Sequence, residues 1–179
     1  LNQFKLNNVD LTQNICKILL KMKKKIPIIY TSSIQAVNNS PYGESKKIAE
    51  NILYEFFLKS NNPVKIYRLP GVFGKWCKPN YNSVVSTFCY LINRNKEISV
   101  NDPKKKIKLI FIDDLIAEFY YSISNTFNSF SFGRVDPVYE LTLEELEKNL
   151  KKFYKSRSQL TIENVGTGFQ RKLYSTFLS

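Results

Sequence analysis

The stretch Ile26-Pro-Ile-Ile-Tyr-Thr-Ser-Ser33 decides the fold class of this chain of 179 residues. Residues 26–30 form a short, continuously apolar run, which is typical of a strand that is buried on both faces of a parallel sheet. Hydroxyl side chains follow at the carboxyl end of that strand, where open α/β sheets bind their ligands. The stretch therefore predicts a parallel α/β sheet with a candidate site at this strand end.

Apolar residues at helical spacing predict helices on both sides of this strand. An amphipathic helix is expected over about 9–24, with the apolar residues Leu11, Ile15, Ile18, Leu19 and Met22. A second helix is expected over about 42–59, with the inward-facing residues Ile48, Ala49, Ile52, Leu53 and Phe56.

Further elements continue the alternation along the chain. Strands are expected at 64–69 and 106–111, helices at about 83–95 and 114–124, and a last helix after the capping box Thr142-x-x-Glu145. Because the connections are short, this order favours βαβ units. The predicted fold class is α/β: a partial Rossmann-like parallel sheet with flanking helices plus a small substrate-binding portion.

The expected organisation is a single partial domain over 1–179. Its sheet-and-helix core is predicted in about 1–70 and 106–125, and a substrate-binding portion and tail in about 71–105 and 126–179. Dinucleotide-binding folds open with a strand, a Gly-rich turn and a helix. Gly166-x-Gly168 lacks a preceding strand and a following apolar helix, so it is interpreted as a loop. We therefore expect the chain to be a fragment, and the structure beyond about 156 stays open.

Composition excludes several classes of function. The chain has no histidine, which excludes histidine-based catalysis and His-ligated metal sites, and no metal is expected. Its three cysteines form no C-x-x-C pair, which favours a reducing, cytoplasmic setting without a disulfide framework. No apolar run approaches the roughly 20 residues of a membrane span, and no signal peptide is evident.

The net charge of +12 raises the alternative of nucleic-acid binding. The lysines are scattered, and the runs 23–25 and 104–106 stand at expected element ends, where lysine complements a helix dipole. A general compositional bias would also raise the charge. No nucleic-acid partner is expected, although a basic surface favours a diphosphate substrate.

Tyr42 and Lys46 stand four residues apart and share one face of the second helix. The lysine ammonium can lie beside the phenol oxygen and stabilise its ionised form, so the tyrosine can give and accept a proton. The alternative is a surface pair on an ordinary helix. Pro41 places the start of this helix right after the loop that follows Ser32 and Ser33. The serine hydroxyls and the Tyr42–Lys46 pair are therefore expected to converge on one crevice. A polar strand cap is the alternative explanation for the serines.

Four motifs resemble the extended short-chain dehydrogenase/reductase family in order and spacing: Tyr30-Thr-Ser-Ser33, Pro41-Tyr-Gly-Glu-Ser-Lys46, Arg68-Leu-Pro-Gly-Val-Phe-Gly74 and Phe111-Ile-Asp-Asp114. The resemblance implies that Tyr42 is the general acid/base, that Lys46 tunes it and holds the nicotinamide ribose, and that Ser33 orients the substrate oxygen. It also places Ser32 and Pro70 at the cofactor. Asn8 is similar to the family's helix asparagine that supports a relay water, and a plain N-cap is the alternative.

A narrower resemblance, to bifunctional reductases of capsular polysaccharide biosynthesis, covers most of the chain. It is carried by Ser33-Ile-Gln-Ala36, Phe73-Gly-Lys-Trp-Cys-Lys-Pro-Asn-Tyr-Asn-Ser-Val85 and Leu173-Tyr-Ser-Thr-Phe-Leu178. The resemblance implies NADPH-dependent reduction of the C4 ketone of a UDP-4-keto-6-deoxy-N-acetylhexosamine, for capsule or O-antigen precursors. It further implies a metal-binding cupin domain, a homodimeric parent, and a Gly-rich front that would bind most of the NADPH; neither the front nor the cupin is present in this sequence.

The loop 70–82 suits a nucleotide sugar. Lysines would neutralise the diphosphate, aromatic rings would pack on a ring of the substrate, and asparagines would read hydroxyls. The candidates are Lys75, Lys78, Trp76, Tyr81, Asn80 and Asn82, and the alternative is a structured loop with solvated lysines. Arg68 is a further candidate, which meets either a phosphate or a structural carboxylate. Asp113-Asp114 is interpreted as a helix cap.

These observations predict the catalytic half of an NADPH-dependent ketoreductase acting on a UDP-amino sugar. Two alternatives stay open. A nucleotide-sugar 4-epimerase or dehydratase would use the same Tyr, Lys and Ser. The second alternative is a chain that is not itself an enzyme: a truncated or degenerate product, or a subunit that completes its fold with another chain.

Overall fold

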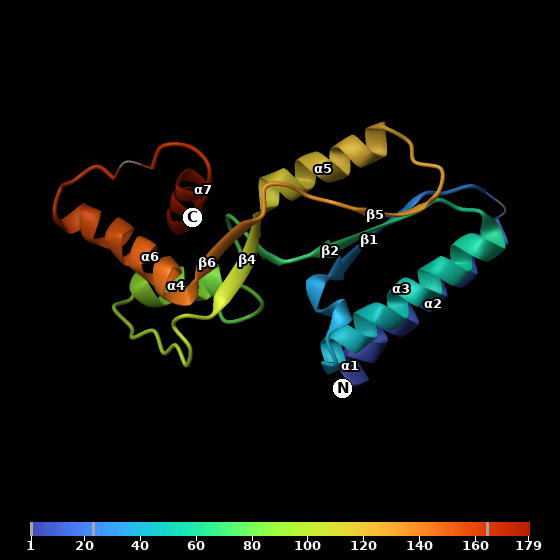
Figure 1. Ribbon diagram of the computed structural model, residues 1–179, viewed down its shortest axis with the longest axis horizontal. Helices are drawn as coiled ribbons and strands as arrows, with labels where there is room; N and C mark the ends of the chain where they lie inside the picture. The colour runs from blue at the N-terminus through green and yellow to red at the C-terminus, as the bar shows by residue number, and fades with distance from the viewer. Residues whose placement is uncertain (1, 23, 164) are drawn as a thin grey trace. The chain divides into compact units, whose positions relative to one another are not determined.

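The computed structural model describes residues 2–22, 24–163 and 165–179, and its chain forms two compact units (Figure 1). The first unit contains the residues up to Pro70 together with Ala117–Val135. The second unit contains Gly71–Ile116 and Asp136–Ser179. Each unit has its own three-stranded sheet and its own core.

The first unit is built around a parallel sheet. Its elements are α1 (Asn2–Phe4), the π-helical segment η1 (Lys5–Asp10), α2 (Leu11–Met22), β1 (Ile28–Ser33), the 3₁₀ segment η2 (Ile34–Val37), α3 (Pro41–Ser60), β2 (Val64–Leu69) and β5 (Phe130–Gly133). Helix α5 (Ile112–Ser124) begins in the second unit and ends in the first.

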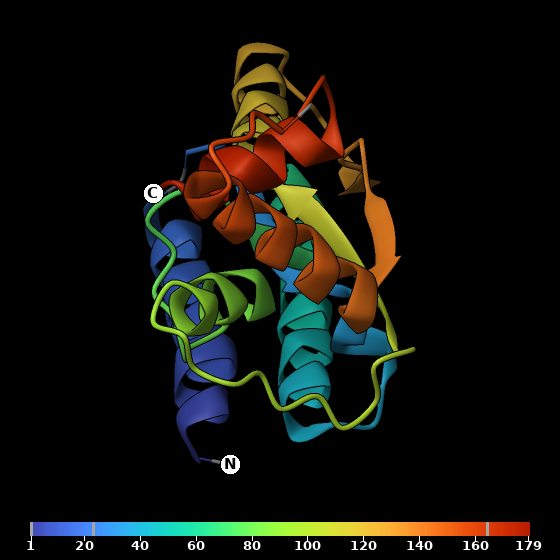
Figure 2. The ribbon, with the colours of Figure 1, turned by 90° about the vertical axis from the view of Figure 1, so that its left-hand side faces the viewer.

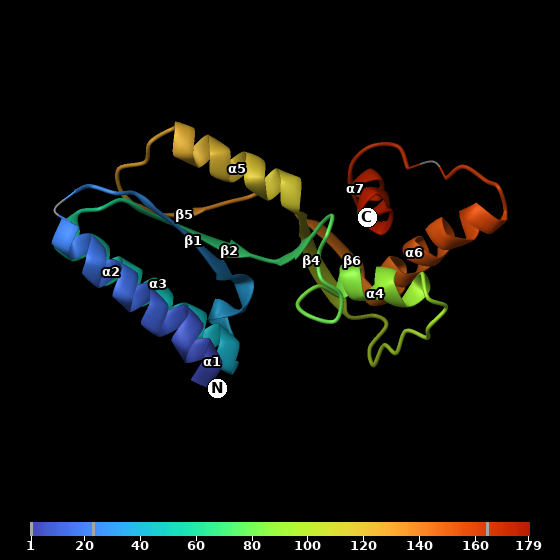
Figure 3. The ribbon, with the colours of Figure 1, turned by 180° about the vertical axis from the view of Figure 1, so that it is seen from behind.

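The sheet of the first unit has the order β1-β2-β5, and both pairings are parallel. Helices α2 and α3 lie side by side on one face, and the part of α5 from Ala117 onward lies on the other (Figure 3). Helices that cover both faces are the usual arrangement around parallel strands. The predicted α/β class, with a parallel sheet and flanking helices, is confirmed.

Helix α2 does not bury the apolar face that its sequence predicts. Thr12 and Cys16, one helical turn apart, are buried where α2 packs against α3. Of the five apolar residues expected to form its face, four are exposed: Leu11, Ile15, Ile18 and Met22. The contact with α3 sets the rotation of α2 about its axis, and this turns the neighbouring stripe outward. Lys23, at the expected end of this helix, lies outside the described residues.

The second unit surrounds a mixed sheet of the order β3-β4-β6. Its elements are β3 (Gly71–Phe73), α4 (Val84–Ile92), β4 (Lys106–Phe111), β6 (Tyr139–Thr142), α6 (Leu143–Ser158) and α7 (Phe169–Phe177). Helices α4, α6 and α7 pack against one another around a core that includes Phe73, Phe88, Leu146 and Leu173 (Figure 2).

The structure divides the chain at points other than the expected ones. Strand β4, which was grouped with 1–70, pairs parallel with β3 and antiparallel with β6. The third strand of the first sheet is instead β5, from the segment assigned to the tail. Across the pair of β4 and β6, Lys106 and Lys108 lie 3.3 and 3.7 Å from the carboxylate of Glu140, a favourable cross-strand contact between exposed side chains.

The sequence predicts where some of the later helices begin, but not all of them. Thr142 and Glu145 form both halves of the capping box that begins α6. Gly166 and Gly168 lie in a loop, as expected, and helix α7 follows them in the segment that the sequence left open. Asp113 and Asp114 lie inside the first turn of α5 and do not cap it; the carboxylate of Asp114 pairs with Lys172 of α7.

Two negative findings hold for the part of the chain that the structure describes. None of its helices combines the length and the apolar character that crossing a membrane requires. No cluster of three or more His, Cys, Asp or Glu side chains among these residues is arranged to hold a metal ion. The three cysteines are free thiols.

Candidate active site

Helix α3 begins where it can present Tyr42 and Lys46 beside the end of β1. Ser40 is the N-cap, and its hydroxyl accepts a hydrogen bond of 3.0 Å from the backbone N–H of Gly43. Pro41 occupies the first helical position, where its missing N–H costs nothing. Tyr42 therefore lies in the first turn and Lys46 one turn later, on the same side of the helix.

Lys46 is held next to Tyr42 by contacts with β1. Its Nζ donates a hydrogen bond of 3.0 Å to the carbonyl oxygen of Thr31. The same atom lies 5.1 Å from the ring centre of Tyr30 and 5.8 Å from that of Tyr42, within the range of a cation–π contact. Burial lowers the pKa of Lys46. The ammonium group is therefore fixed in place with hydrogens left for a ligand.

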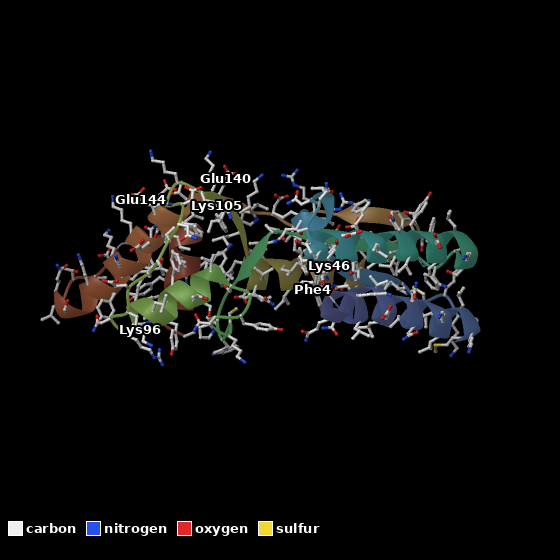
Figure 4. All side chains as sticks on the ribbon, turned by 90° about the horizontal axis from the view of Figure 1, so that it is seen from below. Phe4, Lys46, Lys96, Lys105, Glu140 and Glu144 are labelled. Atoms are coloured by element: carbon white, nitrogen blue, oxygen red, sulfur yellow. The ribbon has the colours of Figure 1, made fainter. Side chains whose placement is uncertain are left out.

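The ring of Phe4 completes the surroundings of Tyr42. The two ring centres lie 5.5 Å apart in an edge-to-face arrangement. Phe4 and Lys46 lie near each other at the N-terminal end of α3 (Figure 4). Tyr42 is half-buried between them, so its ring has a defined place.

Gly43 allows the loop after β1 to approach α3 closely. A Cβ atom at this position would lie 2.1 Å from the carbonyl oxygen of Gln35 and 2.8 Å from that of Asn38. No other residue fits without a shift of backbone. Because Gln35 belongs to η2, which starts directly after Ser33, this contact sets the end of β1 against the first turn of α3.

Ser33 is buried, and its hydroxyl accepts a hydrogen bond of 3.1 Å from the backbone N–H of Gln35. It is therefore the N-cap of η2, as the alternative reading of the strand-end serines has it. Capping uses an acceptor site of the hydroxyl, and its hydrogen stays available to a substrate oxygen. That the Tyr42 hydroxyl comes within hydrogen-bond reach of Ser33, directly or through one water, stays a prediction.

Asn8 does not begin a helix, because the helical run already starts at Asn2. It lies within the π-helical segment η1, a feature frequent at functional sites. Its side-chain amide donates to the hydroxyl of Ser45 in α3 at 3.0 Å, and its backbone carbonyl oxygen accepts a hydrogen bond of 2.5 Å from the hydroxyl of Thr12. Asn8 thus ties the π-helical segment to the helix that carries Tyr42 and Lys46.

Arg68 meets a structural carboxylate, which resolves the alternative that the sequence left open. Its Nε and Nη2 donate to the two oxygens of Glu50 at 2.9 and 2.6 Å. Ser32 donates its hydroxyl hydrogen to the same carboxylate at 2.6 Å. A cofactor contact at Ser32 would therefore use its acceptor sites. Pro70, the other cofactor candidate, is half-buried between β2 and β3.

The remaining substrate candidates lie in the second unit, in the loop between β3 and α4. All six are exposed, and the large rings of Trp76 and Tyr81 are 88% and 74% exposed: Lys75, Trp76, Lys78, Asn80, Tyr81 and Asn82. The backbone N–H of Asn80 donates to the hydroxyl of Thr87 at 2.9 Å, which gives the loop a fixed contact with α4. A cavity of about 230 Å³ in this unit is lined partly by Trp76.

Tyr30, Gly43 and Glu50 belong to the site without having been expected there from the sequence. Glu50 had a detectable signal, because it continues the spacing of Tyr42 and Lys46 by four more residues on the same helical face. Gly43 had a weaker one, since glycine in a helix suggests a close approach of backbone. The contact of Tyr30 with Lys46 crosses from strand to helix, and no local pattern predicts it.

Comparison with known proteins bears on this geometry. The sequence profile of the NAD dependent epimerase/dehydratase family matches residues 2–133. The chain is similar to the UDP-2-acetamido-2,6-beta-L-arabino-hexul-4-ose reductase of Pseudomonas aeruginosa, with 41% identity over 177 residues, 99% of this chain and 48% of the relative.

Solved structures of similar proteins share the fold of this chain. The capsular polysaccharide assembling protein CapF from Staphylococcus aureus is 43% identical, with a TM-score of 0.84, over 93% of this chain and 46% of that one. A dTDP-glucose 4,6-dehydratase from Bacillus anthracis, in complex with NAD, shares the fold at 14% identity and a TM-score of 0.78, over 96% of this chain and 66% of that one. The chain spans about half the length of the first two.

Proposed function

Because this chain belongs to the NAD dependent epimerase/dehydratase family, we propose that it supplies the proton-transfer residues of an NADPH-dependent reductase for nucleotide sugars. The reaction is reduction of the C4 ketone of a UDP-4-keto-6-deoxy-N-acetylhexosamine, in the synthesis of surface polysaccharide precursors. The observation that carries the proposal is the fixed placement of Lys46 beside Tyr42, at the strand end that carries Ser33. The name of the 41% identical relative, a hexul-4-ose reductase, supports the substrate class.

Tyr42 is the proton donor in this proposal. Its hydroxyl gives a proton to the oxygen at C4 as negative charge develops there. The ammonium group of Lys46 stabilises the phenolate that remains. The hydroxyl of Ser33 donates a hydrogen bond to the same substrate oxygen and holds it in line with Tyr42.

The residues of the first unit fit a nicotinamide cofactor. Lys46 uses one hydrogen on Thr31, so two remain for ribose hydroxyls, and its half-buried position limits competition from water. When bound, NADPH supplies the hydride. NADPH rather than NADH follows from the resemblance to capsule reductases. The solved dehydratase with the same fold, which contains NAD, supports a dinucleotide of this kind.

The substrate loop of the second unit fits the diphosphate and rings of a UDP-amino sugar. Lys75 and Lys78 are exposed and free of an ion pair among the described residues, so they can neutralise phosphate charge. Trp76 and Tyr81 offer exposed rings for packing. The proposal places the protein in the reducing cytoplasm as a homodimer, without a nucleic-acid partner.

The test uses the full-length protein that carries this chain, as its cell makes it. It is mixed with NADPH and a UDP-4-keto-6-deoxy-N-acetylhexosamine, NADPH oxidation is followed by absorbance, and the product is identified by mass and NMR. Reduction adds a hydride to C4 and a proton to its oxygen, and it consumes one NADPH per sugar. Inversion without consumption of NADPH would indicate an epimerase, and loss of water a dehydratase. Absence of any reaction would contradict the proposal.

A further inference from the structure

Glu50 is a charged side chain that is almost completely buried, with 2% of it exposed. Burying a carboxylate is costly unless it is paired and hydrogen-bonded. Here Ser32 donates to Oε1 at 2.6 Å, and Arg68 donates to Oε1 at 2.9 Å and to Oε2 at 2.6 Å. Three donated hydrogen bonds hold both oxygens, so the carboxylate has one well-defined position.

The two donors stand on neighbouring strands. Ser32 of β1 and Arg68 of β2 are direct partners in the register of the parallel sheet. Glu50 itself belongs to α3. Its carboxylate therefore joins one helix to two strand ends, at the carboxyl edge of the sheet.

The same helix and the same strand end carry the proposed catalytic groups. Tyr42, Lys46 and Glu50 follow one another at intervals of four residues, about 6 Å of helix rise each, and share one face of α3. Ser33 is the neighbour of Ser32 in the chain. Lys46 contacts the carbonyl oxygen of Thr31, the residue before Ser32. Glu50 thus anchors α3 to β1 one turn beyond the contact made by Lys46.

The charge of Glu50 is retained in the folded protein. Burial acts to raise the pKa of Glu50, but the hydrogen bonds from Arg68 and Ser32, and the positive charges of Arg68 and Lys47, outweigh it and lower the pKa. The carboxylate is therefore ionised near neutral pH, and its hydrogen bonds are of the stronger, charge-assisted kind.

We infer that Glu50 is a positioning residue, whose carboxylate fixes the spacing between Ser33 on β1 and the Tyr42–Lys46 pair on α3. It does not touch the reacting atoms. The inference rests on the proposed function for the roles of these three groups, while the geometry that it explains belongs to the chain itself.

The test compares Glu50→Gln with Glu55→Gln in the full-length protein that carries this chain. Glu55 lies on the same helix but is exposed, so it is the matched control for charge. Because misplacement of catalytic groups by about 1 Å can cost about 100-fold in rate, kcat of Glu50→Gln is expected to fall about 10- to 100-fold. KM for the sugar should change less than about twofold, since the substrate loop is unaltered. Glu55→Gln should match the parent.

Hydrogen exchange gives a second readout that does not need the reaction. In Glu50→Gln, amides of residues 31–37 are expected to exchange at least about tenfold faster, while those of α2 and α4 keep the rates of the parent. Equal acceleration throughout the first unit, or none, would overturn the inference. A parent without reductase activity whose variant still shows local acceleration would contradict the proposed function and support the positioning role.

A double variant guards against simple misfolding. Glu50→Gln leaves Arg68 with no charge partner, which destabilises the protein, whereas Glu50→Gln/Arg68→Met removes both charges. The double variant should recover stability but keep the low kcat and the fast local exchange. If kcat per folded molecule recovers together with stability, Glu50 is merely structural and the inference is wrong.

Discussion

The Nζ of Lys46 lies 5.8 Å from the centre of the Tyr42 ring, with both side chains rising from the first two turns of α3. Neither side chain alone sets this relationship. Thr31 accepts a hydrogen bond from the lysine, and Phe4 packs against the tyrosine ring. Helix α3, strand β1 and helix α1 therefore all contribute to the placement of Tyr42 and Lys46.

Tyr42→Phe should lower kcat about 10²- to 10⁴-fold, or roughly 3–5 kcal/mol of transition-state stabilisation, because it removes a positioned proton donor. Folding and sugar binding should survive, since only the hydroxyl is lost.

Lys46→Met should lower kcat at least as much, because it also removes the ribose contact, and the effect of Ser33→Ala should fall between those of these two variants and the parent. NADPH oxidation by the full-length protein is the measurement. Tyr120→Phe, an exposed tyrosine of α5, is the control. A Tyr42→Phe protein with near-normal kcat would rule out this proton donor.

Gly43→Ala should disturb the site through backbone contact. The new Cβ would lie 2.1 Å from the carbonyl oxygen of Gln35, so η2 must move away from α3. Such overpacking costs about 1–3 kcal/mol of stability. Thermal unfolding measures this cost, and kcat should fall by more than the folded fraction does. Glu44→Ala, at the neighbouring exposed position, should leave both unchanged; an unaltered Gly43→Ala would mean that η2 and α3 are not in the described contact.

Lys75→Ala should act on binding rather than on the chemical step. A contact with the diphosphate is made equally in the ground state and the transition state, so KM should rise while kcat changes little. Steady-state kinetics against the UDP sugar separate the two. Lys104→Ala, another exposed lysine of the second unit, is the control for net charge. Equal effects of the two substitutions would remove Lys75 from the substrate site.

Local pattern predicted much of the fold from the sequence. The apolar run 26–30 was expected as a strand, and Ile28–Ser33 forms β1; the box Thr142-x-x-Glu145 begins α6. Both signals depend on residues next to each other in the chain. The pairing of β4 with β6 instead joins segments about thirty residues apart in the chain, and the sequence does not reveal such a pairing.

The candidate site likewise contains residues that the sequence reveals and one that only the fold reveals. Tyr42, Lys46 and Ser33 carry a spacing that family resemblance can detect, and the structure places the first two in contact. Glu50 has an ordinary place on a helix. Only the fold reveals that its side chain is buried under Arg68, because burial of a charge depends on the opposite strand and not on its own neighbours.

Acid should test that buried carboxylate directly. Hydrogen bonds from Arg68 and Ser32 and nearby positive charges outweigh burial and lower the pKa of Glu50 in the folded state. A carboxyl group whose pKa is lowered by folding adds stability at pH values above its unfolded pKa of about 4.3, and this stability is lost as pH falls through the folded pKa. The melting temperature of the parent should therefore fall more steeply below about pH 4 than that of Glu50→Gln, which has no proton to take up.

At pH 7, Glu50→Gln should be the less stable of the two proteins, because Arg68 is left without its partner. Thermal melts between about pH 3 and 7 measure both effects, and Glu55→Gln should follow the parent throughout. Parallel curves for parent and Glu50→Gln would show that the carboxylate has the same pKa in the folded and unfolded protein, contrary to the contacts described for it.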